Sequence, residues 1–202
     1  MTRILLATRN ARKLLELQRI LDAAPDVAGV TIIGMSDVDD YVEVPESGLT
    51  FADNALIKAR EGAVHTGLAT VADDSGLAVD VMGGMPGIFS ARWCGRHGDD
   101  DANLDLLLAQ VADVPDDALG AAFVCVAALA LPDGRTFTVD GRMPGHLVRT
   151  RRGTGGFGYD PIFVADGQTR TNAELAPEEK DAISHRGKAF RGLAEVIARE
   201  FS

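Results

Sequence analysis

The stretch Thr70-Val71-Ala72-Asp73-Asp74-Ser75-Gly76-Leu77-Ala78-Val79 places two adjacent carboxylates inside a run that otherwise has the apolar pattern of a strand. Asp, Ser and Gly readily build turns, so these residues by themselves favour a turn between two strands. Successive strand side chains point to opposite faces, so only one of Asp73 and Asp74 can face a given cleft. The other must be solvated or held in a local hydrogen-bond network. The same strand end also suits a metal ion, and the rest of the chain decides between these interpretations.

Length, composition and charge limit the classes of function. The 202 residues, 46% hydrophobic and 25% charged, suit one domain over residues 1–202 with one substantial core and leave room for a second lobe. The net charge of −10 repels polyanions, so we expect no contact with nucleic acid. Cys94 and Cys125 lie far apart, no run is long enough to span a bilayer, and Met1–Leu6 has no signal-peptide pattern. We therefore expect a cytoplasmic protein that does not associate with membranes.

The N-terminal segment has the pattern strand, turn, helix. Arg3–Thr8 is a short apolar run, and Asn10 then opens a helical pattern. Its apolar positions share one face, at Leu14, Leu17 and Leu21. Such a junction directs backbone N–H groups and the positive end of the helix dipole beyond the strand, and Lys13 adds a mobile positive charge. The junction can bind an anion, although its spacing is not that of a Walker loop and many such turns bind nothing.

An acidic loop containing Glu46 precedes the next predicted helix. Thr50 begins a capping box, which starts a helix over Phe51–His65. Glu46 therefore lies just before a helix N-terminus. Lys58 shares a helix face with Asn54 and Glu61, and we favour a surface pair with either of them over a contact to a ligand.

Further patterns predict strands, a glycine-rich loop and a helix. We expect strands at Val30–Ile33, Leu77–Val81, Ala121–Leu131 and Thr136–Gly141, a loop at Gly83–Gly87 and a helix at Asp99–Val111. The last two strands form a hairpin, because only Pro132-Asp133-Gly134 and one further residue separate them. The helix and the hairpin supply structure rather than chemistry.

Two later segments carry candidate ligand-binding groups. Gly153–Pro161 has four glycines around Phe157, whose ring is either exposed for stacking or tucked into the core beside a tight turn. Glu178–Ala189 is the most cationic short stretch in the second half and precedes an amphipathic helix that ends near Phe201. Its cations can instead form a solvated helix face; they are Lys180, His185, Arg186 and Lys188.

Together these residues can bind a nucleoside triphosphate with a metal ion. Glu46 and Asp74 can hold Mg²⁺, which takes oxygen ligands and bridges to phosphates while keeping several waters. Cationic side chains can hold the polyphosphate, and Phe157 can stack on a base. The cations concerned are Lys13, Lys180 and Arg186. An acidic protein with these groups is typical of a nucleoside triphosphate enzyme rather than a nucleic-acid binder.

Six motifs in order carry a resemblance to a known family. They are Thr8-Arg9-Asn10-Ala11-Arg12-Lys13, Glu46-Ser47-Gly48-Leu49-Thr50-Phe51 with Asn54-Ala55, Ala72-Asp73-Asp74-Ser75-Gly76-Leu77, Gly84-Met85-Pro86-Gly87-Ile88 with Ser90-Ala91-Arg92, Gly155-Gly156-Phe157-Gly158-Tyr159-Asp160-Pro161 and Ser184-His185-Arg186-Gly187. Over nearly the whole chain they closely resemble the inosine/xanthosine triphosphate pyrophosphatases. The resemblance implies an α/β fold: a strongly twisted mixed sheet flanked by helices, with two lobes and an active-site cleft between them. It also implies a homodimer.

The resemblance further implies a reaction and the residues that serve it. Members hydrolyse non-standard purine nucleoside triphosphates (ITP, dITP and XTP) to the monophosphate and pyrophosphate with Mg²⁺, which cleanses the nucleotide pool. Glu46 and Asp74 would bind Mg²⁺, and Asp74 would accept the proton of the attacking water. Residues implied to contact the phosphates and adjoining substrate are Thr8, Arg9, Asn10, Ala11, Arg12, Lys13, Ser75 and Lys180, and those implied for the base are Phe157, Gly158, Tyr159, Asp160, His185 and Arg186.

Base selection follows from hydrogen bonding. Hypoxanthine and xanthine carry a 6-keto acceptor where adenine carries a 6-amino donor, so donors on Arg186 and protonated His185 would leave adenine mispaired. Two positions depart from many relatives: Arg9 replaces a glycine, and Met143 replaces a tryptophan near the dimer contact or the cleft. The alternatives are a nucleotide pyrophosphatase for dUTP or a modified pyrimidine, and a regulatory protein that binds nucleotide without turnover.

Overall fold

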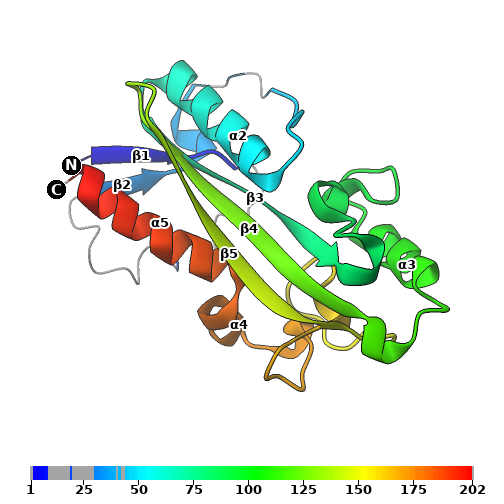
Figure 1. Ribbon diagram of the computed structural model, residues 1–202. Coiled ribbons are helices and arrows are strands. Elements are labelled where there is room, and N and C mark those ends of the chain that lie inside the picture. The colour runs from blue at the N-terminus through cyan, green and yellow to red at the C-terminus, as the bar shows by residue number, and fades with distance from the viewer. Residues whose placement is uncertain (1, 9–18, 20–29, 40, 42–43, 202) are drawn as a thin grey trace. The chain divides into compact units, whose positions relative to one another are not determined.

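The computed structural model describes residues 2–8, 19, 30–39, 41 and 44–201 (Figure 1). The strands are β1 (Thr2–Leu6), β2 (Val30–Ile33), β3 (Ala69–Val79), β4 (Gly120–Ala130), β5 (Thr136–Leu147) and β6 (Phe163–Ala165). The helices are α2 (Phe51–Thr66), α3 (Asp100–Gln110), α4 (Pro177–Ile183) and α5 (His185–Phe201). The helix expected after Asn10 lies outside the described residues. None of the described helices has the length and apolar character needed to cross a membrane.

The strands form one mixed six-stranded sheet in the order β2-β1-β3-β4-β5-β6. β1 is parallel to both of its neighbours, with Ile4 opposite Ile32 on β2 and Ala69 on β3. β5 and β6 are antiparallel. The predicted hairpin joins β4 to β5, and Leu131 N donates to Arg135 O across its turn at 2.9 Å. This is the mixed sheet with helices that the family resemblance implied.

β3 runs without interruption through the Asp-Asp-Ser-Gly segment, so the turn predicted there is wrong. The strand lies between β1, which pairs with Ala69–Val71, and β4, and this backbone pairing within the sheet outweighs the turn preference of the side chains. Beyond Gly76, Leu77 N donates to Ser90 Oγ at 2.9 Å. The strand ends at Val79, because a 3₁₀ helix over Asp80–Met82 replaces the predicted continuation.

The chain divides into two compact units, each assembled from separated segments. Unit 1 consists of Met1–Asp74, Cys125–Gly141 and Arg186–Ser202, and unit 2 consists of Ser75–Val124 and Arg142–His185. β3, β4 and β5 each contribute residues to both units. The single bilobal domain expected from the sequence stays a prediction.

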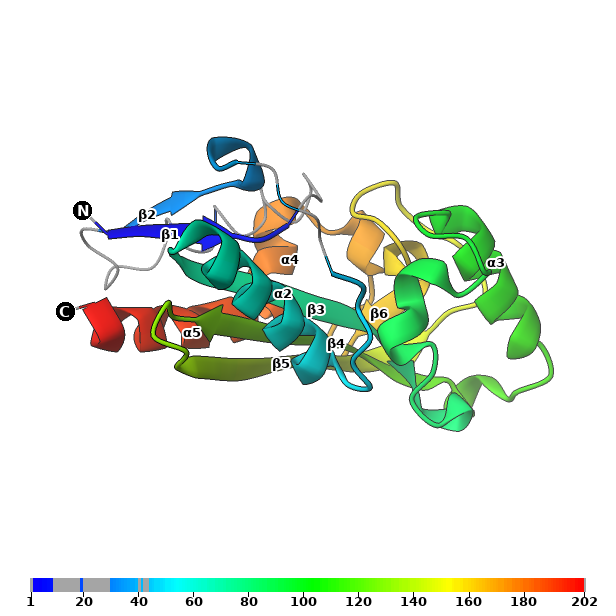
Figure 2. The ribbon, with the colours of Figure 1, turned by 90° about the horizontal axis from the view of Figure 1, so that it is seen from above.

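In unit 1 helices cover both faces of the sheet, and β4 shows why. Its residues alternate strictly: Cys125, Ala127 and Leu129 pack with α5, whereas Val126, Ala128 and Ala130 pack with α2. The α2 side of this contact is formed by small residues, which are Ala55, Ala59 and Ala63. Figure 2 shows both helices lying along the strands of this unit. An apolar strand without polar alternation is therefore explained by burial on both faces.

Unit 2 has its own core, where α3 packs against the ends of the long strands. The buried residues include Leu77, Leu104, Leu107, Phe123, Met143 and Phe163. Met143, the departure from many relatives, is thus a core residue, with 2% of its surface exposed. β5 continues beyond its predicted end at Gly141 to Leu147, because its last residues pair with β6.

Gly76 is required by the close approach of a neighbouring segment. A Cβ at this position would lie 2.5 Å from Ser90 Oγ and still closer to the carbonyl oxygen of Gly87. We expect Gly76→Ala to lower the free energy of unfolding by about 1–3 kcal/mol, the cost of overpacking a rigid site. Urea denaturation measures this change, and an unaltered unfolding midpoint would contradict the described packing.

Candidate functional site

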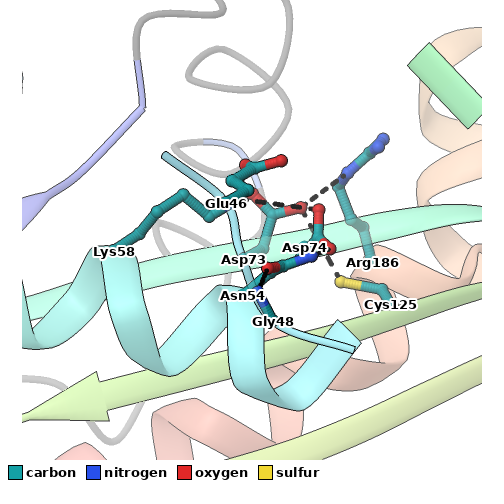
Figure 3. A network of polar contacts seen from close by, with 8 residues as sticks. All are labelled: Glu46, Gly48, Asn54, Lys58, Asp73, Asp74, Cys125 and Arg186. Atoms are coloured by element: carbon teal, nitrogen blue, oxygen red, sulfur yellow. Dashed lines mark hydrogen bonds and ion pairs between the residues drawn. The ribbon is translucent and has the colours of Figure 1, made fainter. Parts of the chain in front are cut away.

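The two aspartates of β3 serve opposite faces of the sheet, as strand alternation predicts. Val71 packs in the cluster beneath α5 and Ala72 in the cluster beneath α2. Asp73, two residues after Val71, therefore lies on the α5 face of the sheet, and Asp74, two residues after Ala72, lies on the α2 face. Asp74 Oδ2 accepts a hydrogen bond from Asn54 Nδ2 at 3.1 Å. Asp73 instead faces the beginning of α5 (Figure 3). Both carboxylates are buried, with exposed fractions of 2% for Asp73 and 7% for Asp74.

The loop that carries Glu46 is fixed to the first turn of α2. Gly48 N donates to Asn54 Oδ1 at 2.9 Å, and a Cβ on Gly48 would lie 2.5 Å from Asp53 Cβ. The predicted capping box is confirmed, since Thr50 Oγ1 accepts from Asp53 N at 3.1 Å and Asp53 Oδ2 accepts from Thr50 N at 3.1 Å. These bonds place Glu46 beside α2, on the side from which Asn54 reaches Asp74 (Figure 3).

Lys58, one helical turn after Asn54, links Glu46 to Asp74. Its Nζ donates to Glu46 Oε1 at 2.7 Å and lies 3.6 Å from Asp74 Oδ1. The predicted surface pair with Glu61 is wrong, because the carboxylate of Glu46 pairs with Lys58 and the carboxylate of Glu61 pairs with His65 instead. Sequence reasoning left Lys58 out of the site. Its spacing of four residues from Asn54 was the available signal.

The charge of Lys58 is set by opposing effects. Burial alone would lower the pKa of this ammonium, but the charges of Asp73, Asp74 and Glu46, with the hydrogen bond to Glu46, raise its pKa above the ordinary value. Lys58 is therefore positively charged at neutral pH. Since one ammonium contacts both Glu46 and Asp74, the two carboxylates are directed toward the same point.

Unit 2 holds a second group of predicted site residues, centred on the buried carboxylate of Asp160. Its Oδ2 accepts from Lys180 Nζ at 2.7 Å and from Phe157 N at 2.9 Å, and its Oδ1 accepts from Asn172 Nδ2 at 3.1 Å. Lys180 Nζ also lies 5.3 Å from the centre of the Phe157 ring, a cation–π contact. Phe157 is half-buried, which is neither of the two states considered for it. A side chain on Gly156 would clash with the Asp160 carboxylate, so the glycine permits this closed loop.

The cationic segment near the start of α5 is largely buried. Lys180, His185 and Arg186 are 8%, 2% and 4% exposed, so a solvated helix face is wrong for these three residues, whereas Lys188 is exposed. The His185 ring stacks on that of Phe123, with centroids 5.0 Å apart and an interplanar angle of 13°. A buried cation requires a specific partner, which makes these residues candidates for more than solubility.

The remaining predicted site residues are spread along the chain. Thr8 follows β1 and is half-buried, and Ser75 is half-buried on β3 within unit 2. Gly158 N donates to Asp100 Oδ2 at 3.0 Å. Five predicted phosphate contacts lie outside the described residues: Arg9, Asn10, Ala11, Arg12 and Lys13. Within unit 1 the structure thus brings Glu46 and Asp74 together, and within unit 2 it brings Phe157, Asp160 and Lys180 together.

This fold and site define an α/β protein in which a carboxylate of the mixed sheet, Asp74, lies beside a helix that carries an ammonium, Lys58, and a loop that carries a second carboxylate, Glu46. In the described part of the chain, no three His, Cys, Asp or Glu side chains form a group that could hold a metal ion. The model of the Ham1 family matches residues 4–196, and the chain belongs to this family.

Relatives and solved structures agree with that membership. A Streptomyces coelicolor protein named dITP/XTP pyrophosphatase is 59% identical over 199 residues, which cover 98% of each chain. The crystal structure of a nucleoside-triphosphatase / dITP/XTP pyrophosphatase from Mycobacterium abscessus matches with a TM-score of 0.78 at 58% identity, covering 96% of this chain and 98% of that one. A HAM1 protein from Coxiella burnetii matches with a TM-score of 0.87 at 38% identity, covering 98% and 100%. The family resemblance and the fold class predicted from the sequence are confirmed.

Tyr159 gives a spectroscopic test of the unit 2 packing. Its O–H donates to Ser90 O at 2.9 Å, and burial, together with the nearby charge of Asp100, raises its pKa far above the ordinary 10.0. Because the folded pKa exceeds the unfolded one, the stability contributed by Tyr159 is complete below pH 10.0 and is lost as the pH rises above it. In Tyr41→Phe, which leaves one tyrosine, we expect no tyrosinate absorbance until alkaline unfolding. Ionisation of the folded variant near pH 10.0 would contradict this.

Proposed function

We propose that this protein hydrolyses the non-standard purine nucleoside triphosphates ITP, dITP and XTP to the monophosphate and pyrophosphate, with Mg²⁺. Removing these nucleotides would protect DNA and RNA from misincorporation. The observation that carries the proposal is the contact of one ammonium, that of Lys58, with both Glu46 and Asp74, because it directs two carboxylates to one point. The name dITP/XTP pyrophosphatase, borne by relatives such as those of Mycobacteroides abscessus and Corynebacterium glutamicum, supports the substrate class.

The donor set in unit 1 suits Mg²⁺. This ion binds one or two carboxylates and substrate phosphates while keeping several waters, so Glu46 and Asp74 are sufficient protein ligands. Their common contact with Lys58 supports the assignment, since the excess negative charge at this point attracts a cation. When bound, Mg²⁺ would neutralise charge on the phosphates and favour attack by water.

In the proposed reaction Asp74 accepts the proton of the attacking water. The water oxygen bonds to phosphorus as the bond to the departing phosphate oxygen breaks, and the two products are the nucleoside monophosphate and pyrophosphate. Asn54 donates to Asp74 Oδ2 and so fixes the orientation of the carboxylate. Lys58 lies near the other oxygen, Asp74 Oδ1, and supplies positive charge for the phosphate oxygens. Thr8, Ser75, Lys180 and residues 9–13 are assigned to the phosphates and the adjoining part of the substrate on the family resemblance.

The base is assigned to the remaining predicted residues. The Phe157 ring offers a stacking surface for the base. The Asp160 carboxylate accepts a hydrogen bond from Phe157 N and so fixes the loop on which this ring lies. Arg186 and protonated His185 donate to the 6-keto oxygen of hypoxanthine or xanthine, and the 6-amino group of adenine would leave these donors mispaired. A homodimer is a further proposal that follows from the resemblance, and a cytoplasmic location is one that follows from the cysteine usage and the N-terminal sequence.

A substrate panel tests the proposed function. The purified protein is incubated with ITP, dITP, XTP, GTP, ATP and dUTP, with Mg²⁺ or with a chelator, and released pyrophosphate is measured. We expect release from ITP, dITP and XTP, and only with Mg²⁺. Preferential release from dUTP would replace this proposal with a pyrimidine enzyme. Binding of ITP without release from any substrate would indicate a regulatory protein.

Asp74→Asn tests the assigned proton acceptor. The change keeps the shape of the side chain but removes its charge, and we expect ITP turnover to fall by about two orders of magnitude or more. The matched control is Asp133→Asn, which removes an exposed carboxylate from the β4–β5 turn and should leave turnover unaltered. Pyrophosphate release is measured for both variants after circular dichroism has shown that they fold. Near-normal turnover in folded Asp74→Asn would remove Asp74 from the mechanism.

A further inference from the structure

We propose that Asp73 is a positioning residue, which holds the Arg186 guanidinium in the orientation that reads the purine base. The inference rests on the proposed function, where Arg186 is assigned to the base. It gives the two adjacent aspartates separate roles: Asp74 faces α2 and the metal and phosphate groups, whereas Asp73 faces α5.

Burial makes the contact between Asp73 and Arg186 a specific one. Asp73 Oδ2 lies 3.5 Å from Arg186 Nε, and the two side chains are 1% and 5% exposed. A charge removed from water to this extent is strongly unfavourable unless an opposite charge lies beside it. Each residue therefore restricts where the other can lie. Such a pair contributes little net stability, but it defines one arrangement of its members.

The carboxylate approaches Arg186 from its inner end. Nε is the nitrogen of the guanidinium nearest to Asp73, and Figure 3 shows the terminal nitrogens on the side away from Asp73 and Cys125. The contact is an ion pair, and the buried negative charge beside Nε favours the position of the guanidinium from which its two terminal nitrogens can donate away from Asp73. Planar donors are the kind that distinguish a keto oxygen from an amino group on a base.

The position of Arg186 in its helix supplies a second reason for an adjacent anion. Arg186 is the second residue of α5 (His185–Phe201), where the positive end of the helix dipole disfavours a cation. A carboxylate beside the first turn offsets that effect. Asp73, on the neighbouring strand, provides the negative charge that lets an arginine remain at this position.

A double-mutant cycle tests the role of Asp73. Wild type, Asp73→Asn, Arg186→Ala and the double variant are assayed with ITP and ATP in the presence of Mg²⁺. We expect Asp73→Asn to lower kcat/KM for ITP by about tenfold or more, mainly through KM, and to lower the ratio of ITP to ATP rates. In the Arg186→Ala background the same change should alter kcat/KM by less than about twofold, because Asp73 acts through Arg186.

Cys125→Ala is the matched control. Its Sγ lies 3.9 Å from the same Asp73 oxygen, so the variant disturbs the surroundings of the carboxylate but leaves the charge pair intact. The ratio of ITP to ATP rates should equal that of wild type. If Cys125→Ala lowers this ratio as much as Asp73→Asn does, general packing rather than the charge pair sets the base preference, and the proposal is overturned.

The outcomes separate this inference from the proposed function. If wild type releases no pyrophosphate from any purine nucleotide, the proposed function fails. If wild type is active and the effects of Asp73→Asn and Arg186→Ala simply add, only the role given to Asp73 fails. Asp73→Ser serves as a second variant where Asp73→Asn does not fold. Failure of both to fold would make Asp73 a structural residue and would also overturn the inference.

Discussion

Alternation of side chains along β3 determines where each charge of the unit 1 site lies. Asp73 and Asp74 are adjacent in sequence, yet one contacts α5 and the other contacts α2, because a strand cannot turn two successive side chains to the same face. A shift of register by one residue would exchange the two carboxylates and place apolar neighbours against the charges. Packing of Val71 beneath α5 and of Ala72 beneath α2 opposes such a shift.

Local charge balance explains how an acidic chain can present an anion site. The protein carries a net charge of −10, but its buried carboxylates have cations beside them. Lys58 lies against Glu46 and Asp74 in unit 1, and Lys180 lies against Asp160 in unit 2. A phosphate that enters such a group can take the place of a carboxylate beside the ammonium, and a metal ion can take the place of the ammonium beside a carboxylate. Such a replacement costs far less free energy than placing a charge in an apolar pocket.

Local patterns predicted local structure well. The capping box at Thr50 and the β4–β5 hairpin were both found where the sequence indicated them, because each depends on residues close together in the chain. Partners from distant segments were not predictable in this way. The segment Asp-Asp-Ser-Gly continues a strand within the sheet instead of forming the assigned turn, and Lys58 bonds to a loop twelve residues earlier rather than to its own helix. The cationic segment left open whether His185 and Arg186 form a solvated helix face, and both are buried.

The first turn of α2 serves two purposes at once. Asp53 and Asn54 accept hydrogen bonds from the backbone amides of Thr50 and Gly48, which precede the helix, and Asn54 also donates to Asp74. Helix ends fray more readily than helix interiors. Partial unwinding here would release the Glu46 loop and the support of Asp74 together while the two hydrophobic cores of unit 1 stay packed. Loss of ligand affinity on warming would then precede loss of the fold, so catalytic competence and global stability would have separate thermal limits.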